Sequence, residues 1–267
     1  LDFKPDWVWI KGRSYADHHA LFDSSRGVGK YLLSSATNAE GSVADTLDEF
    51  RSDGFGLGAD STALVNYQNN TYVSWNWKAN GGTTTTNDAS STGVGSIDSV
   101  IQANTDAGFS IVTYTGTGSA GTVAHGLGAV PKMLIVRNRS EAYNWKVYHA
   151  ENTSAPATDY LVLDNTDVTA DNVTHWADTE PTSTVFSLGT SNALIKNTNT
   201  FVAYCFAEVE GYSKFGSYTG NAADDGAFVY LGFKPAWIIR KRTSGIGDWV
   251  MMDISRNPHN LTDNRIL

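Results

Sequence analysis

Three stretches of the chain share one pattern of polar and apolar positions. Each has a proline, then a run of large apolar and β-branched residues, then basic residues, and the prolines are Pro5, Pro131 and Pro235. A proline is tolerated at the first residue of a strand, where its missing N–H interrupts no ladder. Runs rich in valine, isoleucine and tryptophan are typical of buried strands. We therefore predict that each proline precedes a core strand.

A second pattern, strict alternation, predicts further strands. Between residues 72 and 78 the apolar Val73, Trp75 and Trp77 alternate with polar residues, which indicates a strand with one solvated face. The run 201–206 is similar to it, and the stretches 108–116 and 211–220 are similar to each other. The likeness between distant parts of the chain therefore extends well beyond the proline-led runs.

The spacing of these patterns indicates an internal repeat of about 100 residues. Fourteen residues after the prolines stand His19, Trp145 and Trp249, and eighteen residues after them stand Asp23, His149 and Asp253. We predict a partial β unit at 1–80, a polar Gly/Thr/Ser linker or long loop at 81–107, a complete β-sandwich unit at 108–210 and a partial unit at 211–267. The two partial units either belong to successive repeats or pair with each other.

The fold class follows from the number and length of the predicted strands. Many short strands separated by turn signals, with almost no helical periodicity, favour an all-β protein. We predict antiparallel β-sandwich units of jelly-roll type in a tandem repeat.

Composition and charge exclude several classes of partner and site. The 267 residues include 19 Lys and Arg against 28 Asp and Glu, a net charge of −9, which argues against a nucleic-acid partner. No apolar run is long enough for a membrane helix, so membrane insertion is not expected. The single cysteine, Cys205, lies in an apolar run and is predicted to be a buried, inert thiol. Because Leu1 falls inside a repeat, we expect the sequence to be a segment of a longer protein.

One cluster of side chains is a candidate glycan-binding site. Trp145 and Trp249 would stack on a sugar ring while polar neighbours take its hydroxyls, because glycan sites combine an aromatic platform with a few polar groups. The full candidate set is Trp145, His149, Asp248, Trp249, Asp253 and Arg256. In the alternative, which we favour, the tryptophans pack beneath the basic strands, and Asp23 and Asp253 pair with Arg26 and Arg256 across a turn.

Catalytic and metal motifs are missing from the sequence. Neighbouring carboxylates occur at Asp45 with Asp48 and Glu49, at Asp164 with Asp167 and at Asp224 with Asp225, but each group lies in a polar, turn-like run. Loop carboxylates at the rim of a sandwich could hold Ca²⁺ weakly, and no other cofactor is expected. No HExxH, Cys–His or Gly-x-Ser-x-Gly pattern occurs, so we predict no enzymatic activity and no catalytic residues.

Several phrases of the sequence resemble a module of structural proteins of tailed bacteriophages, particularly marine ones. The phrases are 108–116, 126–128 before Pro131, 203–213 and 233–237, and the resemblance covers nearly the whole chain. It implies a lectin-like β-sandwich in a virion, in a tail fibre or other extracellular appendage. The expected partners are other virion proteins, copies of the same chain and a host surface glycan. The alternatives are a carbohydrate-binding, lectin-like module of a non-viral extracellular protein and a polysaccharide depolymerase.

Overall fold

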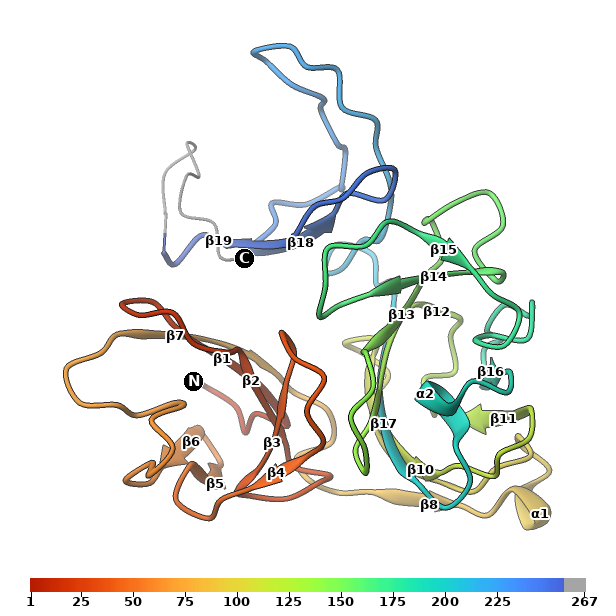
Figure 1. The fold of residues 1–267 in the computed structure, drawn as a ribbon, viewed down its shortest axis with the longest axis horizontal. Helices are drawn as coiled ribbons and strands as arrows, with labels where there is room; N and C mark the ends of the chain where they lie inside the picture. The colour runs from red at the N-terminus through yellow and green to blue at the C-terminus, as the bar shows by residue number, and fades with distance from the viewer. Residues whose placement is uncertain (257–267) are drawn as a thin grey trace.

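The chain folds into three β bodies that meet at a shared apolar core. A computed structural model describes residues 1–256 (Figure 1). We call the bodies the N-terminal sheet, the central sheet and the C-terminal hairpin; they are coloured red to orange, yellow to cyan, and blue in Figure 1. Every strand pair within them is antiparallel, so the protein is all-β, as the sequence predicts.

The N-terminal sheet has the strand order β4-β3-β2-β1-β7. Its strands are β1 (Trp7–Gly12), β2 (Ala20–Asp23), β3 (Lys30–Leu33), β4 (Gly41–Ser42) and β7 (Tyr72–Trp77). The predicted strand after Pro5 is β1, and it is central and buried. A separate hairpin, β5 (Leu47–Arg51) and β6 (Gly54–Leu57), packs with β1 and β2 around a small apolar cluster.

The central sheet has eight strands in the order β15-β14-β13-β12-β17-β10-β9-β8. They are β8 (Thr85–Asn87), β9 (Ser99–Asn104), β10 (Phe109–Thr115), β12 (Pro131–Asn138), β13 (Lys146–His149), β14 (Asp159–Val162), β15 (Ala170–Asp171) and β17 (Thr200–Ala207). The pair β11 (Gly121–Ala124) and β16 (Val185–Leu188) covers one face of this sheet and encloses an apolar core with it. The short helix α2 (Asn192–Ile195) packs against β12.

The predicted linker at 81–107 is largely folded, which corrects the sequence interpretation. β8 and β9 extend the central sheet, and the short helix α1 (Ala89–Thr92) begins after Asp88, whose carboxylate accepts hydrogen bonds from Ser90 and Ser91. The pattern misses β8 because an edge strand is held by backbone hydrogen bonds and can stay polar. Ile101 of β9 supplies the apolar anchor.

The C-terminal hairpin consists of β18 (Trp237–Lys241) and β19 (Trp249–Asp253). The stretch 211–220, whose sequence is similar to that of β10, forms no strand. β10 lies between β17 and β9, whereas no described strand pairs with 211–220, so its tyrosines Tyr212 and Tyr218 stay exposed. Sequence likeness alone therefore does not make a strand where a partner strand is lacking.

The hairpins that follow the three prolines share one register. Trp7 faces Asp23, Met133 faces His149 and Trp237 faces Asp253, so the partners stand two and eighteen residues after each proline. β7 pairs with β1 as β17 pairs with β12: Trp77 lies opposite Trp7, and Phe206 opposite Met133. The offsets seen in the sequence are thus matched by equal positions in the sheets.

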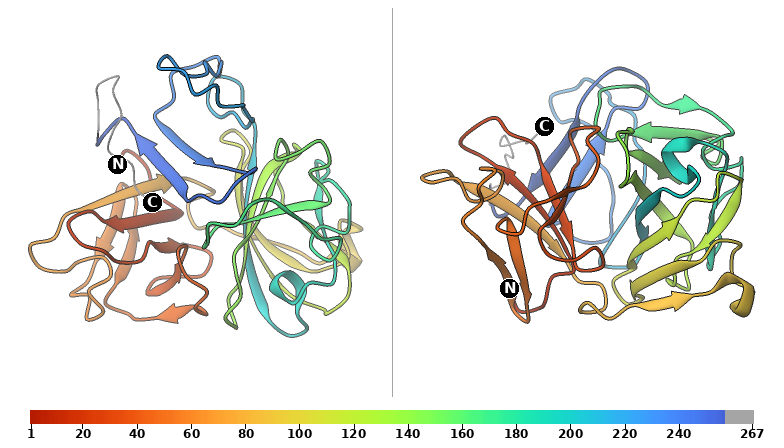
Figure 2. Two further views of the ribbon diagram at one scale, coloured as in Figure 1. Left: turned by 45° about the horizontal axis from the view of Figure 1, so that its top comes forward. Right: turned by 60° about the horizontal axis from the view of Figure 1, so that its bottom comes forward.

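A single apolar cluster draws side chains from all three bodies. Residues at equivalent positions contribute to it, namely those two, four, fourteen or sixteen residues after each proline. They are Trp7, Trp9 and Leu21; Met133, Ile135, Trp145 and Val147; and Trp237, Ile239, Trp249 and Met251. Trp7 stacks on Tyr204 with ring centroids 4.5 Å apart, a contact worth about 1 kcal/mol beyond burial. The three bodies surround this core from different sides (Figure 2).

Candidate functional site

Trp145 and Trp249, the two tryptophans of the candidate glycan site, lie at the junctions between the bodies. Trp145 is 0% exposed, and its indole N–H donates to the carbonyl of Leu33 in the N-terminal sheet at 2.8 Å. The guanidinium of Arg137 lies over its ring at 5.4 Å. A ring with no exposed surface offers no platform to a sugar, and the predicted packing beneath the basic strand is confirmed.

Trp249 makes the same contact at the next junction. Its indole N–H donates to the carbonyl of Val162 in the central sheet at 2.8 Å, and Leu33 and Val162 hold equal places in their sheets, opposite Ala20 and Lys146. The junction from the N-terminal sheet to the central sheet and the junction from the central sheet to the hairpin therefore use one geometry.

A backbone hydrogen bond also recurs at both junctions. The N–H of Glu40 donates to the carbonyl of Arg139 at 2.9 Å, and the N–H of Thr169 donates to the carbonyl of Thr243 at 3.1 Å. Arg139 and Thr243 both stand eight residues after their prolines. Only backbone atoms take part in this bond, so it forms equally well with arginine at position 139 and threonine at position 243.

The predicted ion pairs are confirmed. Nε of Arg26 lies 2.5 Å from Oδ2 of Asp23, and Nε of Arg256 lies 2.5 Å from Oδ2 of Asp253. Burial alone would raise the pKa of Asp253, but the hydrogen bonds from Arg256 lower it below its ordinary value. Both carboxylates are therefore paired with an arginine and satisfied within the fold.

Each of these aspartates also accepts a hydrogen bond from an aromatic residue of another body. The hydroxyl of Tyr204 in β17 donates to Asp23 at 2.7 Å, and the indole N–H of Trp75 in β7 donates to Asp253 at 3.1 Å. Tyr204 and Trp75 occupy equal positions on β17 and β7, two residues before Phe206 and Trp77. The same type of contact therefore occurs twice: once between the central and N-terminal sheets, and once between the N-terminal sheet and the hairpin.

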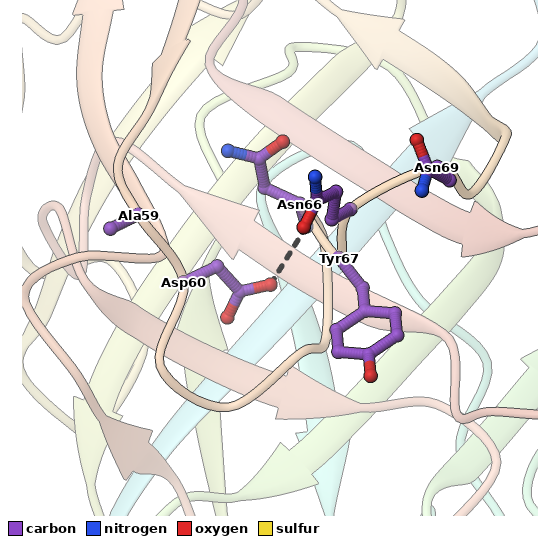
Figure 3. A pocket seen from close by; sticks show the side chains of 6 residues that line it. Ala59, Asp60, Asn66, Tyr67 and Asn69 are labelled. Atoms are coloured by element: carbon purple, nitrogen blue, oxygen red, sulfur yellow. Dashed lines mark hydrogen bonds between the residues drawn. The ribbon is translucent and has the colours of Figure 1, made fainter.

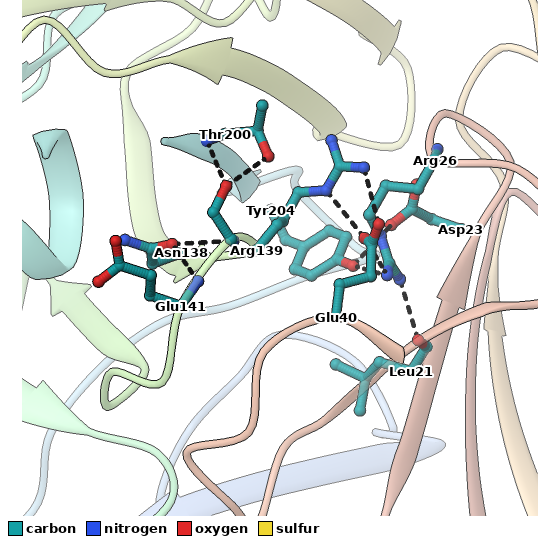
Figure 4. A network of polar contacts seen from close by, with 10 residues as sticks. Leu21, Asp23, Arg26, Glu40, Asn138, Arg139, Glu141, Thr200 and Tyr204 are labelled. Carbon is teal, nitrogen blue, oxygen red and sulfur yellow. Dashed lines mark hydrogen bonds and ion pairs between the residues drawn. The ribbon is translucent and has the colours of Figure 1, made fainter. Parts of the chain in front are cut away.

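The junction between the N-terminal and central sheets contains a network of polar contacts (Figure 4). Glu40 bridges Arg26, at 3.1 Å, and Arg139, at 2.8 Å. Burial opposes the charge of Glu40, but the hydrogen bond from Arg139 and the charge of Arg26 lower its pKa. Because both arginines are anchored, this carboxylate is a structural tie and is unavailable to a ligand.

The remaining predicted site residues do not gather around a cavity. The ring of His149 packs against Phe215 with centroids 6.1 Å apart, its Nδ1 accepts from the N–H of Glu151, and burial lowers its pKa. Asp248 is exposed. Among residues 1–256, no group of three or more His, Cys, Asp or Glu side chains is placed to hold a metal ion.

A wide hollow of about 530 Å³ lies beside the loop 59–69 (Figure 3). Asp60 supplies its only carboxylate, which accepts hydrogen bonds from the N–H groups of Val65 and Asn66 and from the hydroxyl of Thr62. These bonds lower the pKa of Asp60 despite its burial. The charge of this hollow is therefore committed to fixing the loop.

A second hollow, of about 230 Å³, has a different character. Residues from separate segments line it, including Lys146 of β13, His175 after β15 and Asn192 of α2, and we call it the Lys146–His175 hollow. His175 stacks on Tyr160 with ring centroids 3.9 Å apart, and Nζ of Lys146 lies 4.3 Å from the centre of the same ring. The three side chains form one stack at the hollow.

The imidazole is the unsatisfied member of this stack. His175 is 5% exposed, and neither of its ring nitrogens has a hydrogen-bond partner among residues 1–256. Burial, together with the charge of Lys146, lowers the pKa of His175 to about 4, so the imidazole is neutral at pH 7. Burial also lowers the pKa of Lys146, an effect that Asp164 and Asp167 oppose. Sequence reasoning missed this site because its members lie in three unremarkable polar stretches.

Comparison with known proteins yields one family. A family model described as a domain of unknown function (DUF7483) matches residues 1–267. No curated protein and no solved structure matches the chain. Among the described residues, no helix is long and apolar enough to cross a membrane.

Proposed function

The chain belongs to the DUF7483 family, and we propose that it is a non-enzymatic structural segment of a bacteriophage virion, part of a tail fibre or surface appendage. The observation that carries this proposal is the repetition of one set of contacts between the bodies. Trp145 and Trp249 donate to equivalent carbonyls, and Asp23 and Asp253 accept from equivalent aromatic residues. Such recurring unit-to-unit contacts are typical of repeat assemblies, in which each unit is stabilised by its neighbour.

The use of the polar side chains supports a structural role over a catalytic one. Asp164, one of the acids considered for hydrolysis, accepts from the backbone of Trp145 at 2.8 Å and from the amide of Asn144 at 2.9 Å. Asp45 likewise accepts from the N–H and the hydroxyl of Ser61. Carboxylates held in this way fix loops, and their oxygens are not free to reach a substrate as a general acid must. A depolymerase is therefore the weaker alternative.

The surface supports contact with a host glycan as part of the same role. Because the candidate tryptophans are buried or partly buried in the core, a glycan contact would have to use exposed polar groups elsewhere, such as those that line the Lys146–His175 hollow. Carbohydrate binding is equally compatible with a lectin-like module of a non-viral extracellular protein. The two origins differ in where the protein is found, so a test of location separates them.

Immunogold labelling and peptide mass spectrometry of purified phage particles test the virion role. We expect peptides of this chain in intact particles and gold at the tail or an appendage, while antibody against the chain blocks adsorption to the host. If particles from a producing culture lack the chain, the virion proposal is wrong. Release of reducing ends from host polysaccharide by the purified chain would instead establish the depolymerase alternative.

A further inference from the structure

The outer edge of β7 carries backbone groups that pair with no strand. β7 is the last strand of the N-terminal sheet, and among residues 1–256 only β1 pairs with it. The N–H of Arg13 donates to the carbonyl of Thr71. Such bonds recur at every second residue of an antiparallel pair, so the N–H and C=O of Ser74 point away from β1. An unpaired edge of this kind is a template for a further strand.

The central sheet shows which strand belongs at this edge. β17, the counterpart of β7, pairs with β12 on one side and with β10 on the other. It does so while Tyr204 donates to Asp23. The equivalent contact of Trp75 with Asp253 is therefore compatible with a strand at the outer edge of β7. Among the described residues, the N-terminal sheet has no counterpart of β10 at this edge.

Residues 216–220, which we call the donor stretch, have the sequence of the end of β10 but pair with no described strand. Tyr218 and Tyr114 of β10 both stand 17 residues before their prolines. Tyr114 is buried and stacks on Phe201 of β17 with ring centroids 5.0 Å apart, whereas Tyr218 is 55% exposed. Tyr72 holds the place of Phe201 in β7. The donor stretch and the edge of β7 thus each have the residue that the other lacks.

A glycine of the donor stretch matches the hollow beside the loop 59–69. Gly220 corresponds to Gly116, which follows β10, because both stand 15 residues before their prolines. A side chain at Gly116 would overlap the backbone carbonyls of Ile195 and Lys196, whereas Gly220 has open space around it. Within its own chain, therefore, no contact requires a glycine at position 220.

The hollow of about 530 Å³ lies where the counterpart of Gly116 would sit. Residues 66–69 line it and correspond to 195–198. Asn69 and Thr198 accordingly share a left-handed backbone, with φ of 65° and 67°. In the central sheet the turn after β10 occupies the equivalent place, where the carbonyl of Gly116 accepts from the N–H of Thr198. β10 and its turn thus fill two places whose counterparts at the N-terminal sheet are open.

The donor stretch is held apart from β7 in its own chain. Phe215, which precedes it, packs against His149 and Phe206 of the central sheet with ring centroids 6.1 and 6.4 Å apart. Figure 1 shows the stretch, in light blue, rising beside the central sheet and away from β7. A second copy of the chain carries the same stretch and is free to present it to this edge.

We propose that the donor stretch of one copy adds to the outer edge of β7 of a second copy as an antiparallel strand. Tyr218 then lies opposite Tyr72, as Tyr114 lies opposite Phe201, and Gly220 enters the hollow beside the loop 59–69. The donor stretch and the edge are different surfaces, so the contact is head-to-tail and each copy keeps one surface for the next. This contact goes beyond the virion proposal and does not depend on it.

Sedimentation velocity of the 267-residue chain between about 1 and 100 µM tests this contact. We expect the sedimentation coefficient to rise with concentration. Ser74→Pro removes an outward N–H, and Gly220→Val places a side chain against the loop, so each should weaken self-association about tenfold or more. Gly216→Val is the matched control. Gly216 also has open space around it and corresponds to Val112 of β10, 19 residues before the proline, so this variant should associate like the unaltered chain.

A mixture of the two weakened variants distinguishes pairing between copies from pairing within one chain. Ser74→Pro keeps the donor stretch and Gly220→Val keeps the edge of β7, so the mixture should form 1:1 dimers that grow no further. The proposal is wrong if the unaltered chain stays monomeric at about 100 µM. It is equally wrong if the mixture does not dimerise, or if Gly216→Val weakens association as much as Gly220→Val.

Hydrogen exchange in the unaltered chain keeps the test decisive if Ser74→Pro fails to fold. The N–H of Ser74 should exchange more slowly at high protein concentration than at low. The N–H groups of β4, at the opposite edge of the same sheet, should not change. Protection at β4 instead of Ser74, or at neither, refutes the proposed edge. None of these results depends on particle composition, which alone tests the virion role.

Discussion

Replacing Tyr204 by phenylalanine tests whether the buried carboxylate of Asp23 needs a donor from the neighbouring sheet. The change removes the 2.7 Å hydrogen bond to Asp23 and an acceptor lying 3.4 Å from Arg26, and it leaves the ring in its stack with Trp7. Hydrogen bonds to charged groups contribute about 1.5–3 kcal/mol. We expect the free energy of unfolding to fall by about 2 kcal/mol, with little dependence on salt because the pair is buried.

Urea unfolding followed by tryptophan fluorescence measures this loss, with Tyr114→Phe as the matched control. Tyr114 is also buried, but its hydroxyl donates to the neutral carbonyl of Leu194 at 2.7 Å, a bond worth about 1 kcal/mol. Both variants should keep the m value of the unaltered chain, so that their midpoints can be compared. If Tyr204→Phe costs no more than Tyr114→Phe, the tyrosine-to-aspartate contact is not what stabilises this junction.

Three further predictions concern other parts of the molecule. Burial raises the pKa of the Cys205 thiol to about 12, so a maleimide should label it at pH 7.5 only after unfolding; rapid native labelling would contradict its burial. The pKa of His175 is about 4 in the folded state against an ordinary 6.5, so the unfolded chain takes up a proton first as the pH falls. Stability should drop by up to about 3 kcal/mol from pH 6.5 to 4, and His175→Phe should lack this part of the drop in urea titrations at each pH. Trp75→Phe removes the donor to Asp253, so trypsin should cut the hairpin at residues 240–242 faster in this variant than in the control variant Trp176→Phe. Equal cleavage rates would show that the contact does not hold the hairpin in place.

The core strands and the ion pairs could be predicted because their signals are local. The run after each proline is apolar over successive residues, and β1, β12 and β18 follow it. Asp23 with Arg26 and Asp253 with Arg256 are three residues apart, so a turn brings them together whatever the rest of the fold does. The residues two and eighteen positions after each proline lie within one hairpin. Equal spacing in the sequence therefore gives equal strand register in all three hairpins.

The partners across the junctions could not be predicted from the sequence. The donor Trp145 and the acceptor Leu33 are 112 residues apart, and no spacing rule says whether a repeated tryptophan satisfies its N–H in its own unit or in the next one. The Lys146–His175 hollow poses the same difficulty, because its lining comes from three segments. The aromatic residues indicated a glycan site, but Trp145 and Trp249 pack in the apolar core, where their rings bury a large apolar surface.

The direction of the contacts between the bodies limits how the molecule can grow. The central sheet donates to the N-terminal sheet through Tyr204, the hairpin donates to the central sheet through Trp249, and the N-terminal sheet donates to the hairpin through Trp75. Each body therefore donates one of these hydrogen bonds and accepts another. The three head-to-tail contacts together close into a three-membered ring. The three junctions of such a closed ring are all occupied, so a fourth body has no junction of this kind left to fill. A further body or a second copy of the chain would therefore have to bind through surfaces other than these junctions.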